Sequence, residues 1–198
     1  MSRADFIRGG TSGTVALVAG GTLLATAAGP AAAQSRGDKA ILEGAAIAEL
    51  LVIDFLQRAL RSGADLNESV TREVLSDEKR HYRTIAAALD NPPTNVDTSF
   101  PEGTFDSARS IAKLGFTLDS AFTRFYIGAV KRFDSTKLQT LAAGLAANEA
   151  QHLSVFSDVL GRGLIPLPAI PTGISPRAAN RALAPLFTDV DRGSQLTG

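Results

Sequence analysis

The stretch DEKRH at residues 77–81 decides how this chain is interpreted, because it places Glu78 three residues before His81. Side chains three residues apart on a helix lie on the same face, about one turn from each other. A second stretch, NEAQH at residues 148–152, repeats the spacing with Glu149 and His152. The chain has two histidines and seven glutamates, so chance would produce both pairs in roughly one chain in a thousand. The doubled pair predicts two places where a carboxylate and an imidazole converge.

Both stretches lie inside long segments whose apolar residues recur with the period of a helix. Gly63 separates the first two segments, and the Asp-Ser-Thr sequence at 134–136 separates the last two, so each pair is expected to form an antiparallel hairpin. The pattern predicts four long helices, over residues 38–61, 67–89, 105–133 and 135–160.

The segment between the two predicted hairpins, residues 91–103, is rich in Pro, Thr and Asn and has no apolar period. It is long enough to run the length of a helix, so we expect a crossover between the second and third helices. The fold class is therefore all-α, a four-helix bundle over residues 34–163. Residues 164–198 form a C-terminal tail, in which a short helix over 175–186, with Pro176 in its first turn, is expected to pack on the bundle.

Each predicted long helix carries an acidic residue within its apolar stripe, where Lys and Arg do not occur. Burial of an ionised carboxylate costs many kcal/mol unless it is paired, neutralised or bound to metal. Two divalent cations would balance four carboxylates, and the two histidines add neutral nitrogen donors. The predicted metal-binding residues are Glu49, Glu78, His81, Asp119, Glu149 and His152.

Four stretches, AAIAEL at 45–50, DEKRH at 77–81, LDSAF at 118–122 and NEAQH at 148–152, resemble the ferritin-like superfamily, especially exported bacterial ferritin-like domain proteins. The resemblance covers nearly all of the chain after residue 33. It implies a ferritin-like bundle that holds two iron ions, with manganese as the second choice. It also implies that Glu78 and Glu149 bridge the ions, that His81 and His152 each bind one, and that Glu49 and Asp119 are terminal ligands.

Asp119 stands where such families usually have glutamate, and it is shorter by one methylene group. We therefore expect the Asp119 half of the site to be the one that is partly occupied. Glu43 is the rival of Glu49 on the first helix, although Glu49 lies among more apolar neighbours. Tyr126 is two turns after Asp119 and has three interpretations, of which a core tyrosine is the first. The others are a hydrogen-bond donor to a ligand and a radical carrier.

Alternatives remain for the other polar residues near the two motifs. Asp77 and Asn148, each directly before a glutamate, either orient the imidazoles or have solvated or capping roles. The basic residues of the second predicted helix are expected to form a solvated face: Lys79, Arg80 and Arg83. The simplest alternative for the whole pattern is that both Glu-His pairs lie on the surface and bind nothing.

The leading functional hypothesis is a di-iron protein that oxidises Fe(II) or consumes oxygen or peroxide, with metal ions and small oxidants as partners. The alternative is a noncatalytic exported stress or cell-envelope protein that uses the bundle as a scaffold. A homo-oligomer is compatible with either hypothesis. Nucleic acid is excluded as an expected partner, because 20 basic residues balance 20 acidic ones without charge clusters.

The N-terminus resembles a secretory signal peptide over residues 1–33. Arg3 and Arg8 precede an uncharged, Ala- and Gly-rich stretch that ends in three alanines at 31–33. We expect cleavage after Ala33, export to the periplasm, cell envelope or exterior, and no stable membrane anchor afterwards. Residues 2–8 resemble a twin-arginine export motif, but Ala4 replaces the second arginine. The absence of cysteine excludes disulfides and thiolate ligands.

Overall fold

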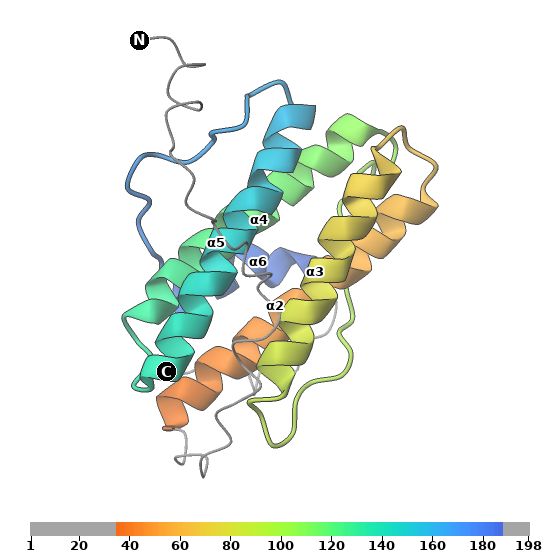
Figure 1. Cartoon of the computed structure of the whole chain (residues 1–198). Helices are drawn as coiled ribbons and strands as arrows, with labels where there is room; N and C mark the ends of the chain where they lie inside the picture. Colours follow the sequence, from red (N-terminus) through yellow and green to blue (C-terminus); the bar gives the residue numbers. More distant parts are fainter. Residues whose placement is uncertain (1–34, 188–198) are drawn as a thin grey trace, which may run out of the picture. The chain divides into compact units, whose positions relative to one another are not determined.

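A computed structural model describes residues 35–187, which form five α-helices and one short 3-10 helix (Figure 1). The described part of the chain contains no strand apart from an isolated bridge between Thr98 and Phe187. The elements are α2 (Arg36–Arg61), α3 (Glu68–Ala86), α4 (Ala108–Val130), α5 (Thr136–Val159), α6 (Pro176–Leu183) and η1 (Ala184–Leu186). The all-α fold class and the short C-terminal helix are therefore as the sequence predicts. The expected signal peptide, residues 1–33, lies outside the described residues.

The four long helices form two antiparallel hairpins, α2 with α3 and α4 with α5 (Figure 1). The first three begin at side-chain caps, because Ser35, Asn67 and Ser107 each accept a hydrogen bond from a backbone N–H in the first turn. Ser135 occupies the corresponding position before α5, but its side chain makes no capping hydrogen bond. The hairpins bring the middle turns of four helices to the same level of the core.

The predicted helices overrun the observed ones by up to three residues at several ends. The reason is that apolar residues of the adjoining turns continue the core after the helix has ended. Leu89 and Phe133 are buried beyond the ends of α3 and α4. Phe105 precedes the Ser107 cap, and its ring centroid lies 5.9 Å from that of Phe55 on α2. The spacing of apolar residues in the sequence indicates which residues are buried. Buried residues continue past the last helical hydrogen bond, so this spacing overestimates the length of a helix.

Residues 87–107 run along the bundle from the end of α3 to the start of α4, which is the predicted crossover (Figure 1). Two sets of contacts hold this segment on the first hairpin. The Tyr82 hydroxyl donates to the Pro93 carbonyl at 2.6 Å, and the Thr98 hydroxyl donates to Asp54 on α2. The Arg58 guanidinium lies 5.2 Å from the ring centre of Phe100. The crossover is thus a packed part of the fold.

The segment after α5 returns along the bundle and leads into α6, which packs against α4 and α2. It crosses α4 closely, since the Ile174 N–H donates to the Arg124 carbonyl at 2.9 Å. Glycine is required at this crossing, because a Cβ on Gly128 would lie 2.0 Å from the Ile174 carbonyl oxygen. The short helix therefore contacts both hairpins. None of the described helices is long and apolar enough to cross a membrane.

Candidate metal centre

The structure brings together all six side chains that the sequence singles out, from four helices. Glu49 lies on α2, Glu78 and His81 on α3, Asp119 on α4, and Glu149 and His152 on α5. All are buried, with relative exposures from 0% for the three glutamates to 7% for His81. The surface alternative for the Glu-His pairs is therefore wrong. Their role as metal ligands stays a prediction.

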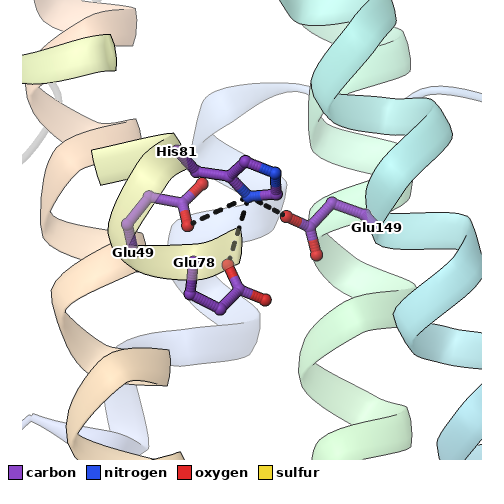
Figure 2. A group of neighbouring side chains, drawn as sticks. All are labelled: Glu49, Glu78, His81 and Glu149. Atoms are coloured by element: carbon purple, nitrogen blue, oxygen red, sulfur yellow. Dashed lines mark hydrogen bonds and ion pairs between the residues drawn. The ribbon is translucent and has the colours of Figure 1, made fainter. Parts of the chain in front are cut away.

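Four of these residues form the first group of potential ligands: Glu49, Glu78, His81 and Glu149 (Figure 2). Each contributes one donor atom, and these four atoms all lie within 4.8 Å of one another. The three glutamates converge on His81 Nδ1, as Figure 2 shows. This nitrogen is 3.1 Å from Glu149 Oε1, 3.2 Å from Glu78 Oε2 and 3.7 Å from Glu49 Oε2. The group therefore offers three oxygens and one nitrogen to a common point.

A second group consists of Asp119, Glu149 and His152, whose donor atoms also lie within 4.8 Å of one another. Glu149 belongs to both groups. His152 Nδ1 is 2.9 Å from Glu78 Oε1 and 3.8 Å from Glu149 Oε2. Glu78 and Glu149 thus each direct one oxygen toward His81 and the other toward His152, which is the arrangement that bridging carboxylates require. The imidazole rings are 5.9 Å apart between centroids.

The outer nitrogens of the two imidazoles face polar residues of the opposite motif. His81 Nε2 is 2.7 Å from Asn148 Oδ1, in a hydrogen bond between α3 and α5. His152 Nε2 is 3.5 Å from Asp77 Oδ2, close enough for an ion pair although it makes no hydrogen bond. Asp77 and Asn148 therefore occupy the positions of residues that orient imidazoles, one of the two interpretations that the sequence allowed.

Tyr126 is buried in the core and its hydroxyl donates a hydrogen bond to Glu49 Oε1. Tyr126 is thus a core tyrosine that also contacts a candidate ligand, as two of the three interpretations predicted, and a radical role stays a prediction. Glu43, the rival of Glu49, is only partly buried and belongs to neither group. Arg80 makes a contact that sequence analysis missed, a 3.0 Å ion pair with Asp77 Oδ1. Its only sequence signal is the spacing of three residues.

Burial and nearby negative charges raise the pKa values of three acidic groups at the site, Glu49, Asp119 and Tyr126. Burial, followed by the charge of Glu78, raises the pKa of Glu49 to about 8, although His81 acts in the opposite direction. Burial and the charge of Glu149 raise the pKa of Asp119 well above its usual range, and His152 partly offsets this. Burial, then the charge of Glu49, raises the pKa of the Tyr126 phenol.

The surrounding carboxylates also raise the pKa values of both histidines. Burial alone would lower the pKa of His152, but Glu149 and Glu78 outweigh it and raise the value to about 11. Burial also acts to lower the pKa of His81, whereas Glu149, Glu49 and Glu78 raise it well above its ordinary value. Protons on these groups therefore supply positive charge that metal cations would otherwise supply.

The donor atoms fit a metal centre because several of them have no other partner. Glu49 Oε2, Asp119 Oδ2 and both carboxylate oxygens of Glu149 are buried and accept no hydrogen bond. Within the described residues, no Lys or Arg forms an ion pair with any of the four carboxylates. Buried, unpaired carboxylate oxygens are costly unless a cation binds them. Oxygen and imidazole donors without thiolate suit iron and manganese.

Comparison with known proteins adds one finding. A family model described as a ferritin-like domain matches residues 37–162, a range that contains all six candidate ligands. No curated protein matches the chain significantly.

Proposed function

The chain belongs to the ferritin-like domain family, and on this premise we propose that its bundle core binds two metal ions. Glu78 and Glu149 are proposed to bridge the ions, because each directs one oxygen toward His81 and the other toward His152. The nitrogen ligands in this proposal are Nδ1 of His81 and of His152. Glu49 and Asp119 complete the two ends, one in each group of neighbouring donor atoms.

One observation carries the proposal: buried carboxylate oxygens from α2, α4 and α5 have no hydrogen-bond donor and face two imidazoles. Four ionised carboxylates carry four negative charges, which two divalent cations would neutralise. These groups do not serve the stability of the core, since burial of apolar residues of similar size would cost less free energy. Metal binding explains why the six residues lie at one level of the bundle.

Iron is the metal we propose first, and manganese second, because carboxylate and imidazole donors suit both. When bound, two neighbouring iron ions would supply the redox chemistry by which Fe(II) is oxidised and oxygen or peroxide is reduced. The residues of the chain bind and orient the ions and exclude water, since none of the six is more than 7% exposed. This burial favours oxidants as small as oxygen or peroxide over larger substrates.

We further propose that the protein acts outside the cytoplasm after removal of residues 1–33. The support is the pattern of Arg3, Arg8 and the uncharged segment that ends in alanines 31–33. N-terminal sequencing of the exported chain tests this proposal. Gln34 is the expected first residue, and an intact Met1 on exported protein would contradict it.

Metal analysis after anaerobic reconstitution with Fe(II) tests the proposed function. The unmodified chain should retain about two iron ions, and the Glu78→Ala, Glu149→Ala double variant should retain none. Glu73→Ala is a matched control, because Glu73 is an exposed glutamate on the same helix as Glu78. An unmodified chain that retains no iron or manganese would overturn the proposal. Oxygen uptake on addition of Fe(II) then separates a redox centre from a metal that only stabilises the fold.

A further inference from the structure

In each motif, the residue directly before the glutamate contacts the histidine of the other motif. Asn148 on α5 lies against His81 on α3, with 2.7 Å between Oδ1 and Nε2. Asp77 on α3 lies against His152 on α5, with 3.5 Å between Oδ2 and Nε2. The two contacts cross between the hairpins in opposite directions. They therefore form a reciprocal pair around the proposed metal centre.

The two members of this pair differ in charge. The Asn148 side chain is a neutral amide, whose oxygen accepts a hydrogen bond from the His81 Nε2–H. Asp77 offers a carboxylate, of which Oδ1 is held by Arg80 Nη1 at 3.0 Å while Oδ2 faces His152. The contact of Asp77 with His152 is an ion pair and not a hydrogen bond. The negative charge of a carboxylate beside the outer N–H of an imidazole makes the inner nitrogen a stronger donor to metal than a neutral acceptor does. The two histidines are thus supported unequally.

The groups of ligand residues are also unequal. The group that contains His81 has four members, including Glu49, which Tyr126 fixes by a hydrogen bond. The group that contains His152 has three members, and Asp119 Oδ2 in it has no hydrogen-bond partner. The charged contact therefore supports the histidine that lies beside Asp119, the shorter of the acidic side chains at the site.

We propose that Asp77 is a positioning residue that selectively supports metal binding at the His152 group, whereas Asn148 positions His81 at the other. The proposal rests on the proposed function, since it requires two bound ions. Its consequence is that the two ions bind in separate steps. Asp77 affects one of these steps, and Asn148 affects the other.

Anaerobic titration of the full metal-free chain with Co²⁺ tests this, because the visible absorption of Co²⁺ reports its ligand field as well as its binding. Asp77→Asn should weaken one of the two steps by about 10- to 100-fold and alter the spectrum of that ion alone. Asp77→Glu, which keeps the carboxylate, should restore much of the loss. Asp158→Asn is the control, because Asp158 is an exposed aspartate on α5.

The double variant Asp77→Asn, Asn148→Asp exchanges the two charges and is the sharper test. It should weaken binding at the His152 group and strengthen it at the His81 group, which a merely structural role would not produce. Circular dichroism of each metal-free variant checks that the bundle is folded, and Asn148→Asp alone gives an independent measurement if Asp77→Asn unfolds. Equal weakening of both steps by Asp77→Asn, or no weakening, would overturn the inference. An unmodified chain that fails to bind two Co²⁺ ions would instead count against the proposed function.

Discussion

Glu78 lies between the two histidines, with its Oε2 3.2 Å from His81 Nδ1 and its Oε1 2.9 Å from His152 Nδ1. It is fully buried, so its negative charge acts on both imidazoles with little screening by water. A single carboxylate thereby links the α3 and α5 histidines.

Glu78→Gln should therefore abolish binding of both ions, because the amide removes the shared charge and one of the two oxygens. The expected loss of affinity exceeds the roughly 10- to 100-fold that loss of an outer contact costs. Isothermal titration with Mn²⁺ measures it. Glu43→Gln, on a partly buried glutamate outside both groups, should bind normally. A Glu78→Gln variant that still takes up two ions would exclude the bridging role.

Asp119→Asn should weaken the second metal-binding step and leave the first intact, since Asp119 belongs only to the three-residue group. Asp119→Glu adds a methylene group and should strengthen that step if the shorter side chain limits it. Stepwise Mn²⁺ titration of the two variants distinguishes these effects. The idea fails if Asp119→Asn weakens the first step as much as the second.

The helical arrangement was predictable from sequence because the relevant signals are local. The spacing of Glu78 from His81, the proline-rich crossover and the period of the four stripes predicted which six side chains lie together. The contacts of Asn148 with His81 and of Tyr126 with Glu49 were not decidable, because they join residues far apart in sequence whose rotation depends on packing. The helix ends near Phe105 and Phe133 were misplaced, since both residues remain in the core outside the helices.

The metal-free protein should lose stability as pH rises above about 4.5. The pKa of Glu49 is raised from 4.5 to about 8, so the folded state binds a proton more tightly than the unfolded state. The contribution of this bound proton to the stability of the fold is complete below pH 4.5 and is lost as pH rises through about 8. His152, raised from 6.5 to about 11, adds a loss between those two values. Urea denaturation of metal-free protein from pH 6 to 9 measures the trend.

Metal binding should reverse this dependence, because cations displace the protons that Glu49 and His152 hold near pH 7. Affinity for Mn²⁺ should rise with pH over the same range, with proton release seen as a binding enthalpy that depends on the buffer. If the metal-free protein instead became more stable between pH 6 and 9, the proposed protonation of Glu49 and His152 would be wrong.

Tyr126→Phe should destabilise the metal-free protein by about 1–3 kcal/mol, because it leaves a buried oxygen of Glu49 without its donor. Tyr82→Phe is the matched control, since that hydroxyl donates to the Pro93 carbonyl at a partly buried position. The control should cost less, about 0.5–1.5 kcal/mol. Equal losses in urea denaturation would mean that the contact between Tyr126 and Glu49 has no special role.

Gly128→Ala should destabilise the bundle, since the added Cβ would lie 2.0 Å from the Ile174 carbonyl oxygen. The segment that leads into α6 must then move away from α4, which breaks the hydrogen bond between the Ile174 N–H and the Arg124 carbonyl. Overpacking of this kind costs about 1–3 kcal/mol. Gly144→Ala on α5 is the control, because nothing lies within 4 Å of its added Cβ, and it should stabilise the helix by up to about 1 kcal/mol. Thermal melting should therefore shift in opposite directions for the two variants. A shift in the same direction would show that the C-terminal segment does not depend on close contact with α4, although α6 packs on both α4 and α2.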